Sequence, residues 1–326
     1  MTPSGLRRSA DVILVVAAAG VIVYIAMVEI RAAADWRPGL LLWPMMDRML
    51  GGWMFAVRML CIVVMAHAAI RALTTGQRPT RLVWAALVIA LCGSLITPIY
   101  GYFSWDLETP IPATVLNAAT IVLVFLLARL VIPRAGSGRK TGDGLRGEEA
   151  ATTPRDVLNK AGWSRPVGDD ANKSIASVQT IPGGLRRSAD VILVVAVAGA
   201  IGYIAMVWMW VTDWWRHDSL LWPIVDMLVD WMFAARMLCI AVMAHAAVRA
   251  LTTGHRPTRL VRAALVIALC GSLITPIHRY FRWDLETPIP AAVLNATAIV
   301  LVFLLARLVI LREGARPESM LSTVKR

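Results

Sequence analysis

The stretch IPATVLNAATIVLVFLLARLVI, residues 111–132, decides the fold class of this chain, and Arg129 is its only charged residue. A helix that crosses a bilayer needs about 20 predominantly apolar residues. This stretch is therefore typical of a membrane-spanning helix. The composition of the 326 residues agrees, with 58% hydrophobic and 17% charged residues. A soluble globular protein is less apolar and more highly charged, so a soluble enzyme and a disordered chain are both excluded.

Nearly the same stretch, IPAAVLNATAIVLVFLLARLVI, recurs at residues 289–310, and the repetition extends through most of the chain. GLRRSADVILVVA at 5–17 recurs at 184–196, AALVIALCGSLITPI at 85–99 recurs at 263–277, and WDLETPIPA at 105–113 recurs at 283–291. The offset is 179 residues between Asp47 and Asp226 and 178 between Trp53 and Trp231, so the second copy lacks one residue near Gly51-Gly52. The chain therefore contains two tandem copies of one sequence unit.

Each copy contains four apolar stretches of bilayer length. They are residues 12–28, 53–73, 82–103 and 111–132, then 191–211, 231–251, 260–281 and 289–311. Gly76 and Pro79 end the second stretch, and Thr80 begins the third. The sequence predicts an all-α integral membrane protein with about eight spans, organised as two four-helix bundles.

The domain boundaries follow from the change in composition. The repeats occupy residues 5–133 and 184–312, and the polar residues 134–183 and 313–326 form a linker and a tail. The linker is rich in Gly, Ser, Asp, Lys and Arg, and such a segment buries too little surface to offset its ordering entropy. We expect a flexible linker, with one short helix over 155–161.

The apolar block from Leu40 to Leu73 is too long for one span, because a single helix would be about 50 Å long against a bilayer core of about 30 Å. We expect it to break near Gly51-Gly52. Residues 40–50, and 219–229 in the second copy, would then be short amphipathic segments, either interfacial or re-entrant.

The distribution of arginines predicts the orientation. Most of them lie on one side of the spans, and Asp106 and Glu108 lie on the other. The first side carries Arg7, Arg8, Arg71, Arg78, Arg81, Arg134, Arg186, Arg187, Arg249, Arg256, Arg259 and Arg262, whereas Arg31, Arg37, Arg48, Arg279 and Arg282 lie opposite. Both termini and the linker are therefore expected in the cytoplasm of a bacterium, with the chain in its plasma membrane. An even number of spans per copy makes the repeats parallel.

The net charge of +12 is explained by these orienting loops, so the expected partners are the lipid bilayer and a second copy or another membrane protein. No nucleic-acid partner is expected.

Three polar residues of the first copy share one depth in the predicted bundle. Arg58 lies about 8 Å inside the outer end of its span by helix rise, and Thr97 and Asn117 lie at a similar depth in the next two spans. The second copy repeats this layer with Arg236, Thr275 and Asn295. The carboxylates expected to pair with the arginines are Asp47, Asp106, Glu108, Asp226, Asp284 and Glu286.

Three interpretations of this intramembrane polar layer stay open. The arginine side chains extend to the outer headgroups, with Asn117 joining helices. Alternatively, each arginine pairs with a carboxylate and locks the bundle, or the layer is part of an ion or substrate pathway.

His67 lies near Cys61 and Met65, and thiol and thioether groups suit copper(I). Cys61 and Met65 share a helix face, but His67 is about 120° away from Cys61, at about 100° per residue. We therefore expect His67 and His245 to be packed or interfacial histidines. No catalytic residue, metal site or cofactor is expected.

Part of each copy is similar to known membrane proteins. Trp43, Pro44 and Asp47, the loop at 78–81 and WAALV at 84–88 follow an apolar span in a pattern that resembles four-span membrane proteins of actinobacteria. Some of those proteins are linked to plasmid spread during conjugation, so the resemblance implies a setting of this kind and no particular site residue.

We therefore expect a non-enzymatic polytopic membrane protein that acts through assembly or partner interaction in the membrane. The alternative is a pore or transporter for a small anionic solute, with Arg58 and Arg236 in its path.

Overall fold

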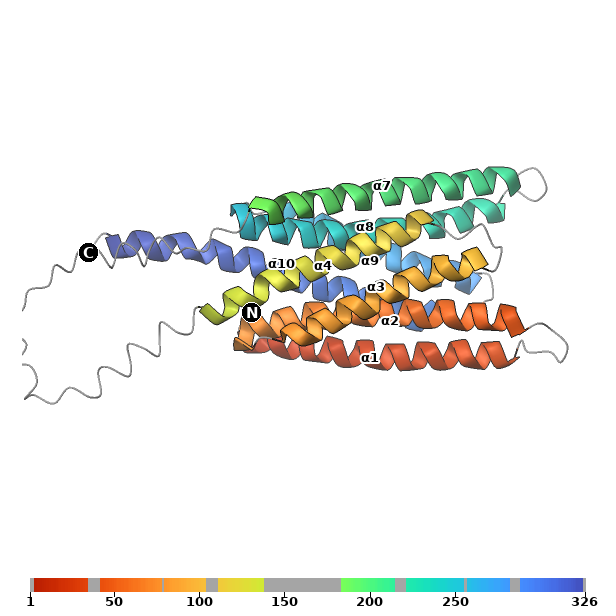
Figure 1. The fold of residues 1–326 in the computed structure, drawn as a ribbon, viewed down its shortest axis with the longest axis horizontal. Coiled ribbons are helices and arrows are strands. Elements are labelled where there is room, and N and C mark those ends of the chain that lie inside the picture. The colour runs from red at the N-terminus through yellow and green to blue at the C-terminus, as the bar shows by residue number, and fades with distance from the viewer. Residues whose placement is uncertain are drawn as a thin grey trace, which may run out of the picture.

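The structure is a computed structural model, and it describes residues 3–34, 42–77, 79–103, 111–137, 183–214, 221–254, 257–281 and 288–324. The sequence-predicted linker helix at 155–161 lies outside these residues. The helices of the described part of the chain are α1 (Pro3–Ala34), α2 (Leu42–Thr75), α3 (Thr80–Phe103), α4 (Ile111–Ser137), α7 (Gly183–Trp214), α8 (Leu221–Thr253), α9 (Thr258–Phe281) and α10 (Pro288–Val324). They lie side by side (Figure 1), so the predicted all-α architecture is confirmed.

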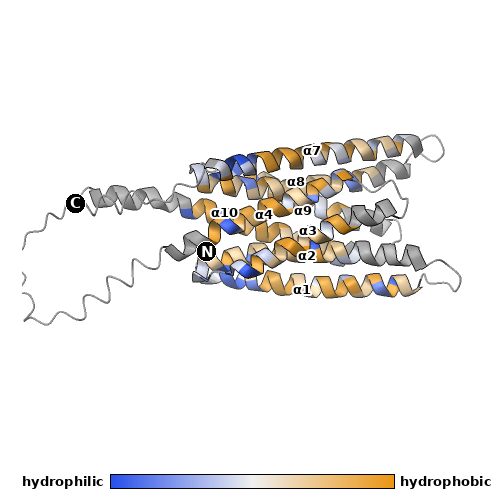
Figure 2. Cartoon of the chain, viewed as in Figure 1, coloured by the Kyte–Doolittle hydropathy of each residue, from blue (hydrophilic) through white to orange (hydrophobic). Residues whose placement is uncertain are grey.

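Among the described residues, six helices are long and apolar enough to cross a membrane. The stretches are Gly5–Ala34, Gly52–Thr75, Ile111–Ile132, Gly184–Met209, Asp230–Thr253 and Ile289–Arg312. A shorter apolar stretch, Thr80–Ile96, lies in α3. Figure 2 shows hydrophobic residues along the lengths of the helices, and hydrophilic residues near helix ends such as the starts of α1 and α7. The architecture is that of a multi-pass membrane protein.

The turns after α2 and α8 form as their sequences predict. Gly76 has φ of 73° and Gly254 has φ of 69°, a left-handed conformation that glycine adopts without a steric cost. The amide of Gly76 donates to the carbonyl of Ala72 at 2.9 Å, and Gly254 donates to Ala250 at 3.0 Å. These hydrogen bonds satisfy carbonyls at the helix ends.

The expected break at Gly51-Gly52 is wrong, because α2 is one helix of 34 residues and α8 is one helix of 33. Glycine inside a helix costs only about 1 kcal/mol relative to alanine, which packing can offset. A Cβ atom at position 52 would lie 2.9 Å from Cγ2 of Val28, so the glycine allows α1 to approach α2 closely. Residues 42–50 and 221–229 therefore extend the spanning helices and form no separate interfacial segment.

The sequence predicts two self-contained four-helix bundles, but the two halves pack on each other. Helix α4 of the first half packs on α7 and α8, and α10 of the second half packs on α1 and α2. The side chain of Leu294 lies against Gly20, and the backbone of Leu116 lies against Gly199. Helix α4 also packs on α2 and α3, and α10 on α8 and α9, so each fourth helix lies between the two halves and the core is continuous through both.

The core is centred on α2, α4, α8 and α10, which carry its largest fully buried side chains. These are Ile62, Met65, Ile70, Leu116, Ile121, Leu123, Leu127, Ile132, Ile240, Met243, Leu294 and Ile299. Helices α1 and α7 bury only part of their surface and expose large apolar residues such as Val15 and Val194. Exposed apolar surface of this extent suits contact with lipid. Helix α10 continues to Val324, into the segment expected to be a polar tail.

Candidate functional site

A short polar contact joins α1 to α2 near the beginning of α1. Nε2 of His67 lies 2.7 Å from Oδ1 of Asp11, and the imidazole N–H donates to the carboxylate. The side chain of His67 is 9% exposed, whereas that of Asp11 is 45% exposed. Arg7 lies one turn before Asp11, with its Nε 3.8 Å from Oδ2. The contact thus has a buried imidazole on one side and a carboxylate open to solvent on the other.

The second half repeats this contact in α7 and α8. Nε2 of His245 lies 2.7 Å from Oδ1 of Asp190, with side-chain exposures of 9% and 44%. Nε of Arg186 lies 4.0 Å from Oδ2 of Asp190. We call the two contacts the histidine–aspartate pairs. Each pair fixes the distance between the first two helices of its half at the end where the arginines gather.

The sequence predicts His67 as a packed or interfacial residue, which its burial confirms, but it does not pair His67 with Asp11. The sequence also places Asp11 in the first turn of its helix, which is wrong because α1 begins at Pro3. The signal was available, because consecutive antiparallel spans bring the start of one helix beside the end of the next. A buried histidine also needs a hydrogen-bond partner, and Asp11 is an acidic residue at the same depth.

Arg58, the centre of the predicted polar layer, is half-buried in α2. Its Nε donates to the carbonyl of Met54 at 3.1 Å, within its own helix. A Cβ atom at Gly93 of α3 would lie 3.7 Å from Cγ of Arg58. The equivalent Arg236 is only 7% exposed, and a Cβ atom at Gly271 of α9 would lie 3.2 Å from its Cγ. Both arginine stems therefore pack against a glycine of the third helix of their half.

The other predicted members of the layer are only partly described. Asn117 is buried in α4, and Asn295 is half-buried in α10. Thr97, Thr275, Asp47 and Asp226 lie in helices, but their side chains are outside the described residues, as are Asp106, Glu108, Asp284 and Glu286 entirely. The pairing of the arginines with these carboxylates therefore stays a prediction.

The second half contains a carboxylate that the sequence analysis did not consider. Asp230 stands at the position that Gly52 occupies in the first copy. The hydroxyl of Tyr203 in α7 donates to Oδ1 of Asp230 at 3.0 Å, and Tyr203 is only 8% exposed. Asp230 lies about 9 Å before Arg236 along α8. The second half thus has an acidic group, a phenol and a buried guanidinium along one helix pair.

A further polar contact crosses between the halves. Oγ1 of Thr120 in α4 donates to the carbonyl of Leu116 at 2.8 Å, and it also lies 3.3 Å from the carbonyl of Met237 in α8. Thr120 is fully buried. This contact joins α4 to the second half at Met237, the neighbour of Arg236 in the chain.

The residues considered for copper binding have other surroundings in the structure. Cys61 and Met65 are buried, His67 is engaged by Asp11, and all four cysteines are free. Among the described residues, no three His, Cys, Asp or Glu side chains lie close enough together to hold a metal ion.

Comparisons with protein-family models, curated proteins and solved structures found no match to this chain.

Proposed function

We propose that this chain is a non-enzymatic membrane protein that works through assembly, with a second copy or with another membrane protein. The observation that carries the proposal is the packing of α4 and α10 against both halves. Two four-helix units that complete each other in this way pack as two subunits of a dimer do. The chain contains this dimer in fused form, so its fold is built around association between units.

The polar contacts support the same conclusion. The histidine–aspartate pairs, the Tyr203–Asp230 contact and the Thr120 contact each join two different helices. In a bilayer, such hydrogen bonds and close contacts at small residues hold helices together, since lipid supplies no hydrophobic drive between them. These side chains therefore join helices within one chain, which is the same kind of contact that would join it to a membrane partner.

In the topology that we propose, all eight helices cross the bilayer. Helices α3 and α9 have 24 residues each, about 36 Å of helix, which is enough for a core of about 30 Å. The end that carries Arg7, Arg71 and Arg186 faces the cytoplasm by the positive-inside rule, and both halves point the same way. The host membrane is a bacterial plasma membrane, and the resemblance to conjugation-linked proteins suggests a mobile element as the setting.

Counting copies in membranes tests the proposal. The full-length chain, tagged with a fluorescent protein, is extracted directly into lipid nanodiscs, and photobleaching steps are counted per particle. We expect two or more copies per particle, or one copy with a stoichiometric membrane protein companion identified by mass spectrometry. A single copy without such a companion would overturn the proposal.

A second candidate function is a pore or transporter for a small anionic solute. The observation in its favour is the burial of Arg236, whose cationic group would attract an anion inside the membrane. Chloride flux into proteoliposomes would be compared for the wild type, the Arg58→Leu/Arg236→Leu double variant and an exposed control, Arg8→Leu. Flux that is lost only in the double variant would favour this function over assembly.

A further inference from the structure

The two halves differ at one end of α3 and α9, where a tryptophan in the first half is replaced by an arginine in the second. Trp84 of α3 packs edge-on against Phe125 of α4, with ring centroids 4.7 Å apart. The guanidinium of Arg129 lies over the same indole, 5.7 Å from its centroid. In the first half, the indole is 48% exposed and lies between the two helices, against Phe125 and Arg129.

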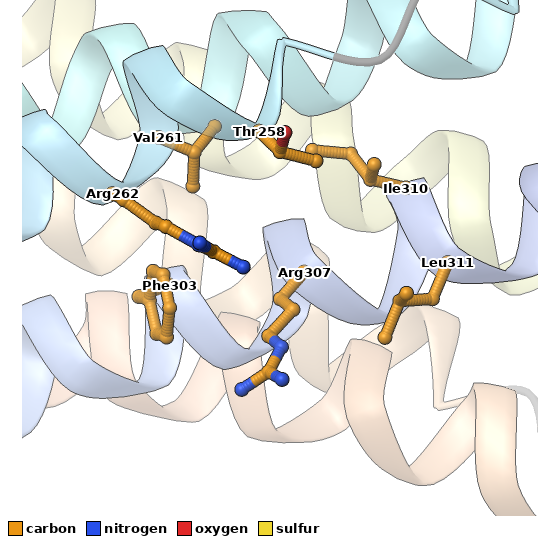
Figure 3. A pocket seen from close by; sticks show the side chains of 7 residues that line it. All are labelled: Thr258, Val261, Arg262, Phe303, Arg307, Ile310 and Leu311. Carbon is orange, nitrogen blue, oxygen red and sulfur yellow. The ribbon is translucent and has the colours of Figure 1, made fainter.

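Arg262 stands at the equivalent position in α9, while Phe303 and Arg307 of α10 correspond to Phe125 and Arg129. The space that the indole fills in the first half is a pocket in the second, lined by both arginines, Thr258, Val261, Phe303 and Ile310. Figure 3 shows Arg262 reaching from α9 across the pocket toward α10, where Arg307 projects from the next turn after Phe303. The substitution therefore removes a filling side chain and adds a second cation.

The charges of this pocket call for an anion. Within the described part of the chain, neither Arg262 nor Arg307 forms an ion pair or a side-chain hydrogen bond. Two arginines that line one pocket give it a positive charge, which attracts an anion. Thr258 begins α9, so the free N–H groups of the first turn of that helix lie at the same end. Guanidinium groups bind phosphate oxygens through paired N–H donors.

The surroundings of the pocket indicate where the phosphate comes from. Leu311 of α10 lines the pocket and is 60% exposed, so apolar surface adjoins the arginines. A headgroup phosphate in the pocket would leave an acyl chain beside this leucine. A free phosphate ion would make no use of it. Anionic lipids are concentrated at the cytoplasmic surface, which is where the proposed topology places this end of the helices.

We propose that the pocket between α9 and α10 binds the phosphate of an anionic phospholipid headgroup, held by Arg262 and Arg307. The first half lacks this site because Trp84 occupies its space. Within the described residues, the site is therefore specific to the second half although the sequence is duplicated. This proposal uses the membrane location but does not depend on how many copies assemble.

Native mass spectrometry of the full-length chain in detergent tests the site, with phosphatidylglycerol and phosphatidylcholine added in separate titrations. We expect one phosphatidylglycerol to be retained preferentially. Arg262→Trp, which restores the residue of the first half, and Arg307→Gln should each weaken its binding about tenfold or more, the loss of a charge-assisted hydrogen bond. Arg262→Gln serves as a second variant if the tryptophan perturbs folding, which circular dichroism would reveal.

Two matched controls separate the pocket from general charge. Arg129→Gln removes the equivalent arginine of the first half, and Arg187→Gln removes an exposed arginine near the start of α7; neither should change lipid retention. Equal binding by wild type, Arg262→Gln and Arg307→Gln would overturn the proposal, as would equal retention of phosphatidylcholine. A third titration adds inorganic phosphate to the chain with phosphatidylglycerol bound. Displacement of the lipid by phosphate at a similar concentration would identify a soluble anion as the ligand and would overturn the lipid assignment.

Discussion

The contact between α4 and α7 provides the sharpest test of the packing between the halves, because it depends on the absence of a side chain at Gly199. A Cβ atom at Gly199 would lie 3.0 Å from the amide nitrogen of Leu116 and 3.1 Å from the carbonyl oxygen of Pro112. Both atoms belong to the backbone of a helix, and a closely packed helix does not yield as the end of a side chain does. Gly199→Ala must therefore move α7 away from α4.

Two opposing contributions set the size of the effect. Alanine favours the helix over glycine by about 0.5–1 kcal/mol. Overpacking of a closely packed interior typically costs about 1–3 kcal/mol, and contact with backbone places this site near the upper value. We expect Gly199→Ala to lower the free energy of unfolding by about 2 kcal/mol.

Two other glycines provide matched controls. Gly20 is the equivalent of Gly199 in the first half, but a Cβ atom there would meet the side chain of Leu294 at 3.3 Å, which can adjust by a change of rotamer. A Cβ atom at Gly184 would meet nothing within 4 Å. Gly20→Ala should therefore cost less than about 1 kcal/mol, and Gly184→Ala should change stability by no more than about 0.5 kcal/mol.

The assay is unfolding of the full-length chain in mixed micelles by titration with SDS, followed by circular dichroism and tryptophan fluorescence. The order of stability expected is Gly184→Ala, then Gly20→Ala, then Gly199→Ala as the least stable. If Gly199→Ala is as stable as Gly184→Ala, then α4 does not lie against α7 and the packing of α4 on the second half is wrong.

Three further predictions use the same unfolding assay. Asp11→Asn and Asp190→Asn should each lower the free energy of unfolding by about 1–3 kcal/mol, because each removes a hydrogen bond to a charged group. The two decreases should agree within about 0.5 kcal/mol, because the two contacts have the same geometry. Unequal decreases would contradict the equivalence of the two pairs. Gly76→Ala should cost about 1 kcal/mol, because alanine must adopt the positive φ of this turn, and an unchanged stability would show that the turn is not left-handed. Tyr203→Phe should cost about 1 kcal/mol or more in the wild type and nothing when Asp230→Gly is also present, so equal costs in both backgrounds would refute the contact.

The sequence was sufficient for features that depend on neighbours along the chain. The length of the apolar stretch at 111–132 identifies a helix without knowledge of its partners, because the bilayer sets that length. The turn at Gly76 follows in the same way from one glycine and a nearby proline. The break at Gly51-Gly52 failed because the cost of glycine in a helix is small, and the approach of Val28 decides what the position is used for.

The packing of α4 and α10 against the opposite half could not be predicted, for a reason that lies in the duplication itself. The two copies of the fourth helix have almost the same sequence, so polarity and periodicity do not show which surface of the helix meets its own half and which meets the other half. The contact with the other half depends on packing details such as Gly199 against the backbone of Leu116, which appear only in three dimensions.

The positions where the copies differ are more informative about function than the positions they share, because recent copying alone explains identity. Two of these differences place a charged residue in the second half where the first has Gly52 or Trp84. Asp230 receives a hydrogen bond from Tyr203 on the α7–α8 side, and Arg262 opens a cationic pocket on the α9–α10 side. Neither charge is needed to complete the shared core, because the first half packs without them. Under the proposed function, these two positions are therefore where the second half would make contacts that the first half does not make.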